Sequence, residues 1–463
     1  MLRLFDSVVG EVRELELRDE GQFSMYVCGP TVNDLPHLGH GRFSLVWDVV
    51  RRWLSWSGLE VTYVSNITDI DDRIINRATA EKRSESEVAA QFEGEWNQAM
   101  RALGVAEPTR TPHATQFVSE MVELILTLIQ RDIAYETVDG VYFDVSKVAD
   151  YGALAGQPLE ELRSGARVEA NDDKRSPLDF AVWKKAKPGE PRWPAPFGDG
   201  RPGWHTECVV MSLALLGDGF DLHAGGFDLR FPHHENERAQ AVALGKLFAR
   251  RWSHNGWVMV GDEKMSKSLH NFTSLTDLLS ETDQRAYRLL VLRSHYRSPI
   301  EVSPSTINDA QRALARLDAL ARRFSLPVLA GDSIERRGDL EWPNVAGELE
   351  RKVSDRLDDD LDTPRALALL FDAVSAANAA ADGGDDLGGR TLALAVNALF
   401  GALGLPLIAS DGAELNERTA TLVRERDIAR AERHWAEADR IRDELVAEGW
   451  TVEDSASGTV IRR

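Results

Sequence analysis

A strand, a helix and a second strand follow one another near the start of the chain, and this pattern restricts the fold more than any other feature. Phe23–Val27 and Glu60–Ile67 are short apolar runs typical of buried strands. Between them a helix begins near Leu38, carries apolar residues on one face and stops at Ser57-Gly58. Two strands joined by a helix lie parallel in one helix-covered sheet. The sequence therefore predicts an α/β fold built on a parallel sheet.

The remaining pattern indicates further domains, as expected for a chain of 463 residues. Asp139-Gly140 between two strand-like runs predicts a two-residue hairpin turn, so an antiparallel segment is expected between two halves of the parallel sheet. The stretch from Asn171 to Gly203 is rich in Pro, Gly and Trp, and we interpret it as a long packed loop. From Pro304 the pattern is helical, and a charged helix, Arg424–Glu448, precedes two short strands.

Composition limits the compartment and the partners. Two cysteines cannot form a disulfide framework, which favours a reducing environment. The N-terminus lacks the apolar core of a signal peptide, and no run of about 18 apolar residues could span a bilayer, so we expect a cytoplasmic protein without a membrane segment. The net charge of −21 argues globally against nucleic acid, although a local basic face can coexist with it. An acidic surface also simply favours solubility.

The two cysteines stand in a pattern that suits a metal. Cys28 ends the first strand, and Cys208 lies 180 positions later, shortly before His233 and Glu237. Two thiolates, an imidazole and a carboxylate form a tetrahedral donor set for Zn²⁺. The alternative is that both cysteines are small buried apolar residues, as free cysteines usually are. The ligand is His233 or His234, and His233 is preferred because Glu237 follows it by four residues on one helix face.

Two further motifs point to phosphate chemistry. His37-Leu38-Gly39-His40 stands at a helix start after a strand, where backbone amides and two imidazoles can donate to an anion. Lys264-Met265-Ser266-Lys267-Ser268 places two ammonium groups and two hydroxyls on a loop that could clamp a triphosphate. Each motif alone is weak, because a His-rich turn is often a helix cap and a Lys-Ser pair is usually solvated. Their joint occurrence is a strong signal.

These two motifs resemble the HIGH and KMSKS signatures of the class I aminoacyl-tRNA synthetases, which carry them on a Rossmann-type sheet. More narrowly, the chain resembles the cysteinyl-tRNA synthetase family essentially from end to end. The segments that carry this resemblance are Cys28–Val32, Asn66–Asp72, Gly200–His205, Phe231–Glu237, Asp358–Pro364 and the tail from Trp435 to Thr459. Asn33 and Ile461 depart from the family pattern, which often has aromatic residues there, and Ile461 puts the tRNA contacts of the tail in doubt.

The resemblance implies a domain order. The implied domains are 1–125, the first half of a Rossmann-type catalytic domain; 126–199, a connective insertion; 200–303, the second catalytic half; 304–408, a helical tRNA-binding domain; and 409–463, a small α+β anticodon-binding module. It also implies one Zn²⁺ per chain, ATP with Mg²⁺, L-cysteine and tRNA-Cys as partners. Nothing in the sequence indicates an obligate dimer, so a monomer is expected.

Roles for individual residues follow from the same resemblance. The implied metal ligands are Cys28, Cys208, His233 and Glu237. The implied ATP contacts are His37, Gly39, His40, Asp228, Lys264 and Lys267, and the implied cysteine pocket contains Gly29, Thr31, Thr68, Trp204 and His205. The implied anticodon contacts are Arg430, Asp439 and Asp454. Simpler readings stay open for some of them. Asp228 could be a turn residue, Trp204 could be core packing, and the three C-terminal residues could form surface salt bridges.

The implied reaction joins cysteine to tRNA through cysteinyl-adenylate. Zinc would select the thiol of the substrate over the hydroxyl of serine, so no editing domain is expected. The nearest alternative is the related ligase of the mycothiol pathway, which transfers activated cysteine to a glucosaminyl-inositol and resembles only the catalytic portion. A zinc- and nucleotide-binding regulator without catalysis is a third reading, which the complete HIGH and KMSKS motifs disfavour.

Overall fold

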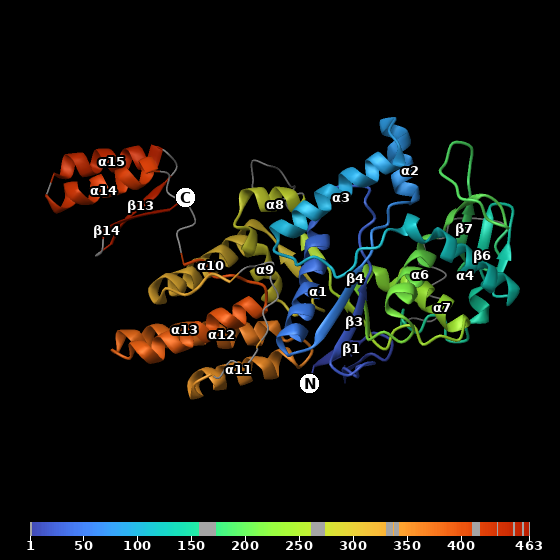
Figure 1. The fold of residues 1–463 in the computed structure, drawn as a ribbon, viewed down its shortest axis with the longest axis horizontal. Coiled ribbons are helices and arrows are strands. Elements are labelled where there is room, and N and C mark those ends of the chain that lie inside the picture. Colours follow the sequence, from blue (N-terminus) through green and yellow to red (C-terminus); the bar gives the residue numbers. More distant parts are fainter. Residues whose placement is uncertain are drawn as a thin grey trace.

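The computed structural model describes residues 2–156, 173–260, 274–329, 337, 342–409, 417–432, 434–447, 450–455 and 458–462. Figure 1 shows a central sheet with α1 against it, the strands of an insertion on the right and a group of helices on the lower left. Within the described part of the chain, no helix has the length and the apolar character needed to cross a membrane.

A parallel sheet of four strands forms the centre of the molecule. Its order is β10-β9-β3-β4, and all three strand pairs are parallel. The strands are β3 (Gln22–Val27), β4 (Glu60–Ser65), β9 (Leu222–Gly226) and β10 (Trp252–Asn255). Helix α1 (Leu38–Trp56) connects β3 to β4, which confirms the predicted strand–helix–strand unit. β4 ends two residues earlier than predicted, because the Ile67 amide donates to the Pro112 carbonyl (2.8 Å).

Helices α1 and α6 (Trp204–Leu216) pack against this sheet, and further helices and short strands surround it. The further helices before residue 300 are α2 (Asp72–Glu81), α3 (Glu85–Ala102), α4 (Val118–Gln130), α7 (Glu235–Ala243), α8 (Leu275–Glu281) and α9 (Gln284–Leu292). β1 (Arg3–Asp6) pairs antiparallel with β2 (Glu11–Glu14), and β11 (Val258–Val260) pairs parallel with β12 (Ile300–Val302). Helix α1 is buried along most of its length, with Trp47 and Trp53 in the main core, because it is packed on several sides.

The insertion is a second, antiparallel sheet of order β5-β6-β7-β8. Its strands are β5 (Ala134–Glu136), β6 (Gly140–Phe143), β7 (Phe180–Lys185) and β8 (Gly200–Pro202). The prediction of a hairpin is confirmed, but the prediction of a two-residue turn at Asp139-Gly140 is wrong. Gly140 belongs to β6, where a Cβ atom would lie 2.1 Å from the Trp183 carbonyl oxygen, so glycine is needed for close strand approach. The prediction of a loop across 171–203 is wrong where β7 and β8 stand.

The C-terminal third is helical, as predicted. α10 (Pro304–Phe324), α11 (Asn344–Leu357), α12 (Thr363–Asp382) and α13 (Asp386–Ala402) share the main core, and Leu314, Leu317 and Leu320 are buried in it. A smaller module follows, with α14 (Glu417–Ala431), α15 (Trp435–Ala447) and the antiparallel pair β13 (Thr451–Ser455) and β14 (Gly458–Arg462). The single helix predicted for Arg424–Glu448 is wrong, since two helices lie there around a separate core with Leu422 and Ile441.

A buried ion cluster joins α1 to the rest of the molecule. Asp48 pairs with Arg51 (2.9 Å), Arg52 (2.7 Å) and Arg288 of α9 (2.8 Å). All four side chains are buried. Burial opposes ionisation of Asp48, but the three guanidinium groups outweigh it and hold the pKa of this carboxyl well below its ordinary range. Arg288 also donates to the Leu403 carbonyl (3.2 Å), which ties α1 and α9 to the end of the helical region.

We expect Asp48→Ala to destabilise the protein by about 3–5 kcal/mol, because it leaves three buried cations without their counter-charge. The matched control is Asp309→Ala, which removes an exposed partner of Arg312 and should cost less than about 1 kcal/mol. Urea unfolding of both variants, followed by circular dichroism, measures the difference. Equal midpoints for the two variants would contradict the assigned role of the cluster.

Candidate active site

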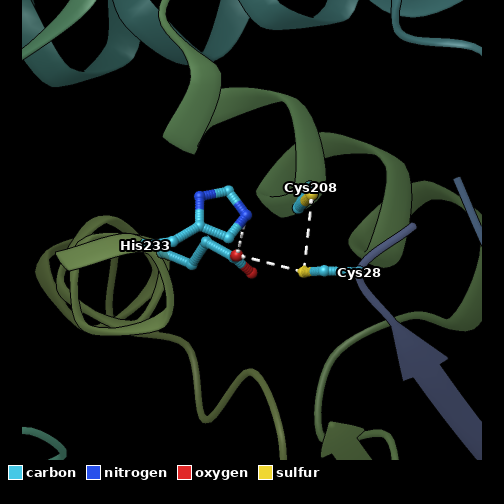
Figure 2. A group of neighbouring side chains, drawn as sticks. Cys28, Cys208 and His233 are labelled. Carbon is cyan, nitrogen blue, oxygen red and sulfur yellow. Dashed lines mark hydrogen bonds and ion pairs between the residues drawn. The ribbon is translucent and has the colours of Figure 1, made fainter. Parts of the chain in front are cut away.

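Four side chains from different elements meet in the interior at the edge of the parallel sheet (Figure 2). Cys28 directly follows β3, Cys208 lies in the second turn of α6, His233 lies in the short η4 helix (Arg230–His234) and Glu237 lies on α7. Their ligand atoms all lie within 4.8 Å of one another, and no side chain is more than 3% exposed. The two sulfur atoms are 3.7 Å apart, and Glu237 Oε1 is 3.4 Å from the Cys28 sulfur and 2.8 Å from His233 Nε2.

Further polar side chains orient this cluster. His223 Nε2 lies 2.5 Å from Glu237 Oε2, and His205 Nδ1 lies 2.9 Å from His233 Nδ1. The amide oxygen of Asn66 accepts from the Gly29 amide (2.9 Å) and lies 3.7 Å from the Cys208 sulfur. Such outer contacts fix the orientation of potential ligands.

His234 belongs to an overlapping cluster. Its ligand atoms, together with those of Cys28, His223 and Glu237, also lie within 4.8 Å of one another. That set uses only one of the two cysteines. His234 Nδ1 lies 2.9 Å from His254 Nε2, and its Nε2 has no hydrogen-bond partner among the described residues. Only the set with His233 contains both cysteines.

The charge state of the cluster favours a cation. Burial raises the pKa of Cys28, reinforced by the neighbouring Cys208 and Glu237. For Cys208, burial is outweighed by contacts with Cys28 and His233, which lower its pKa to about 6. Burial also opposes ionisation of Glu237, yet His223 and His233 hold its pKa well below the ordinary value. For His233, burial is outweighed by Glu237 and Cys208, which raise the pKa to about 10, so an imidazolium balances part of the charge of the buried thiolate and carboxylate. Two sulfurs, one nitrogen and one oxygen fit the coordination preferences of Zn²⁺.

A cavity of about 870 Å³ connects this cluster to the HIGH turn. Eight of the residues predicted for the site line it: Cys28, Gly29, Thr31 and Trp204 near the cluster, and His37, Gly39, His40 and Asp228. Two predicted pocket residues do not line it. Thr68 is buried and donates to Glu207 (3.0 Å), while His205 contacts His233. Predicted residues as far apart in the sequence as Cys28 and Asp228, 200 positions, thus line one cavity.

The HIGH turn is a helix cap as well as a lining of the cavity. His37 is the N-cap of α1; its Nδ1 accepts from the His40 amide (3.3 Å), and His40 Nδ1 accepts from the His37 amide (3.2 Å). Burial lowers the pKa of His37, and burial with the neighbouring His37 lowers that of His40 to about 3. Both rings are therefore neutral at pH 7 and, since Nδ1 accepts, carry the proton on Nε2. The turn offers N–H donors at a helix N-terminus, where anions are stabilised.

The remaining predicted residues lie elsewhere. Lys264 and Lys267 fall outside the described residues. In the C-terminal module, Arg430 lies 3.9 Å from Asp427, and Asp439 is exposed on α15. Asp454 lies in β13, opposite Thr459 of β14.

Sequence reasoning missed several residues that the fold brings to the site. Asn66 and Asn255 each lie at the carboxyl end of a parallel strand, and such positions in open α/β sheets face the ligand crevice. That position in the sheet is the signal that could have found them. Phe227 and Trp257 also line the cavity.

Comparison with known proteins identifies the family of the chain. The family described as "tRNA synthetases class I (C) catalytic domain" matches residues 14–312, the DALR domain matches 352–407, and the cysteinyl-tRNA ligase anticodon binding domain matches 412–462. Two relatives are the cysteine–tRNA ligases of Methylobacillus flagellatus, 44% identical, and of Chromobacterium violaceum, 43% identical. In each case the match covers 100% of both chains.

Two solved structures share the fold. Methionyl-tRNA synthetase of Mycobacterium tuberculosis, in complex with methionyl-adenylate, superposes with a TM-score of 0.58 at 15% identity, over 82% of this chain and 89% of that one. A putative arginyl-tRNA synthetase from Campylobacter jejuni gives a TM-score of 0.55 at 13% identity, over 85% and 94% of the two chains. At such identities the likeness concerns the fold alone.

The first helix of the parallel sheet carries the HIGH turn, and the catalytic family of class I synthetases matches residues 14–312. This protein is therefore an enzyme of the class I aminoacyl-tRNA synthetases. The relatives that match along its full length narrow the class further. The chain belongs to the cysteine–tRNA ligase family.

We expect the purified protein to contain about one zinc ion per chain. Cys28→Ala and Cys208→Ala should each lower that content strongly, because each removes one of the four buried donors. His113→Ala is the control, since His113 pairs with Glu93 outside the cluster and should leave the zinc content unchanged. Atomic emission measures the metal, and full zinc content in both cysteine variants would contradict the proposed ligand set.

Proposed function

We propose that this enzyme joins L-cysteine to tRNA-Cys with consumption of ATP, in two steps through cysteinyl-adenylate. The observation that carries the proposal is the single cavity that Cys28 of the buried cluster shares with His37 and His40 of the HIGH turn. Such a cavity allows an amino acid and a nucleotide to lie side by side. The cysteine–tRNA ligase names of the full-length relatives support the choice of substrate.

The inner end of the cavity is proposed to select the amino acid. Cys28, Cys208, His233 and Glu237 would hold Zn²⁺, with His223 orienting the Glu237 carboxylate. When bound, the ion supplies a soft Lewis acid that accepts the thiol sulfur of cysteine far better than the hydroxyl of serine.

The HIGH end is proposed to bind ATP together with Mg²⁺. The Nε2–H groups of His37 and His40, with the amides at the start of α1, would donate to phosphate oxygens. Asp228, exposed at the same cavity, is proposed to accept from the ribose hydroxyls. Lys264 and Lys267 would stabilise the charge that develops on the departing pyrophosphate.

In the first step, the cysteine carboxylate attacks the α-phosphorus of ATP, and the bond to pyrophosphate breaks. In the second, a hydroxyl of the terminal ribose of tRNA attacks the adenylate carbonyl, and AMP leaves with the bonding electron pair. No side chain forms a covalent bond, so the enzyme contributes positioning and electrostatic stabilisation.

The remaining assignments belong to the same proposal. The helical region and the C-terminal module would hold tRNA, with Arg430, Asp439 and Asp454 as candidate contacts to the anticodon. The match of residues 412–462 to an anticodon binding domain supports that placement. We further propose a monomer that acts in the cytoplasm.

We expect Lys267→Ala to slow cysteine-dependent ATP–pyrophosphate exchange by about 100-fold or more, because it removes a cation at the departing phosphates. Circular dichroism should report an unchanged fold. Lys352→Ala removes an equally basic but exposed side chain of α11, paired with Glu348, and should leave the exchange rate unchanged. Full exchange activity in Lys267→Ala would refute the assigned role.

Transfer of radiolabelled cysteine tests the acceptor. With purified tRNA-Cys and glucosaminyl-inositol in competition, we expect the label on tRNA only, since a C-terminal anticodon-type module is present. Label on the sugar would retain the adenylate chemistry but move the function to small-molecule ligation. Serine should not compete at equal concentration.

A further inference from the structure

The N-terminal residues of two helices line the cavity beside the buried cluster. Arg73 is the second residue of α2, and Trp204 is the first residue of α6. The Trp204 ring stacks on the ring of His233, with the centroids 4.1 Å apart and an angle of 17° between the ring planes. The position of Trp204 therefore affects both the shape of the cavity and the orientation of a proposed zinc ligand.

An ion cluster lies close to both helix starts. The Asp72 carboxylate, at the first position of α2, accepts from Lys184 of β7 (2.7 Å) and from Arg201 of β8. Arg201 lies three residues before Trp204, and Lys184 is its cross-strand neighbour in the sheet of the insertion. One carboxylate therefore ties two strands of the insertion to the start of α2.

Arg201 depends on Asp72 for its counter-charge. Its side chain is 7% exposed, and in the described part of the chain no other carboxylate pairs with its guanidinium. Removal of the Asp72 charge would leave a buried cation without a partner, which is costly. Burial opposes the ionisation of Asp72 itself, but the hydrogen bond from Lys184 and the charge of Arg201 outweigh it and lower the pKa of this carboxyl below its ordinary value. The cluster is therefore charged at neutral pH.

The chain between Arg201 and Trp204 is held against β7. Gly203 is the N-cap of α6, and its amide donates to the Val182 carbonyl (2.8 Å). A Cβ atom at this glycine would lie 2.0 Å from the Ala181 carbonyl oxygen, so only glycine lets the chain come this close to β7. Any shift of β8 and β7 would therefore move Trp204 with them.

The segment that ends at Asp72 also makes contacts deeper in the molecule. Thr68 Oγ1 donates to Glu207 of α6 (3.0 Å), and the amide oxygen of Asn66 lies 3.7 Å from the Cys208 sulfur. These four side chains are buried, whereas 44% of the Asp72 side chain is exposed. A change at Asp72 therefore alters the outer link between the two segments and leaves the buried contacts in place.

We propose that Asp72 is a positioning residue for the amino-acid substrate, which through Arg201 fixes Trp204 where it lines the cysteine end of the cavity. Asp72 itself does not line the cavity, so it acts only through these neighbours. Small displacements of positioned groups change binding and rate strongly, even when the altered residue is remote from the substrate. The inference rests on the proposed function for the identity of the substrate.

Steady-state ATP–pyrophosphate exchange tests this role. We expect Asp72→Asn, which removes the charge and keeps the shape, to raise the KM for cysteine about tenfold and to leave the KM for ATP within about twofold. Lys184→Met should act in the same direction but more weakly, because Lys184 is 29% exposed whereas Arg201 is 7% exposed. The matched control is Glu81→Gln at the other end of α2, where Glu81 pairs with Arg77 (2.7 Å), and neither KM should change.

A double-mutant cycle separates positioning from general destabilisation. Arg201→Gln should raise the KM for cysteine as Asp72→Asn does, and the double variant should be no worse than either single variant, because the two side chains act as one unit. Additive losses in the double variant, or equal rises in the KM for cysteine and for ATP, would overturn the proposal. Zinc content and circular dichroism check that each variant is loaded and folded. If Asp72→Asn fails to fold, an unchanged KM for cysteine in Lys184→Met, the mildest change, would equally overturn it.

Amide hydrogen exchange separates this inference from the proposed function. If the unaltered enzyme shows no cysteine-dependent ATP–pyrophosphate exchange, the proposed function fails. Deuterium uptake by residues 200–208 then still reports how firmly β8 and the start of α6 are held. Faster uptake in Asp72→Asn than in Glu81→Gln would support the inference, and equal uptake would overturn it.

Discussion

The parallel alignment of β3, β4, β9 and β10 is the constraint on which the rest of the structure depends. Parallel strands bring their carboxyl ends to the same edge of the sheet, and ligands of open α/β sheets bind outside that edge. Cys28 follows β3, Asn66 follows β4, Asp228 lies just beyond β9, and Asn255 ends β10. Residues distant in the sequence meet there because parallel pairing brings the carboxyl ends of all four strands to one edge of the sheet.

The buried charges of the molecule depend on that frame in two different ways. Around Asp48, three guanidinium groups from two helices supply the compensating charge, so the cluster is complete within the chain. Around Glu237, a thiolate and a carboxylate are buried together, and the neighbouring histidines balance only part of their negative charge. The first arrangement is structural, and it fixes α1 and its HIGH turn. The second is suited to receive a cation.

Periodicity in the sequence predicted the local units well. The β3–α1–β4 unit follows from apolar runs at strand and helix spacing, and the four donors near Cys28 follow from residue types and the spacing of His233 and Glu237. The hairpin turn was mispredicted because Gly140 serves a close approach between strands, which has no local signature. Strand β7 was missed because flanking Pro and Gly residues dominate its region.

Other site residues could not be predicted, because their roles depend on strand order. Sequence alone does not state that β9 lies between β3 and β10, and this neighbourhood is what places Trp257 against Phe227. Likewise, the partners of Asn255 Oδ1 can be counted only once the burial of that side chain is known. The HIGH turn shows a mixed case: its histidines were predicted to line the cavity, and they also cap α1, so one pair of side chains serves both stability and binding.

The two ends of the cavity differ in burial, and the difference suits the proposed reaction. The donors around Cys28 are almost fully excluded from solvent, whereas Phe227 and Trp257 keep about half of their surface exposed. Discrimination between cysteine and serine requires an interaction that only one of them can make, and such interactions are strongest where water is absent.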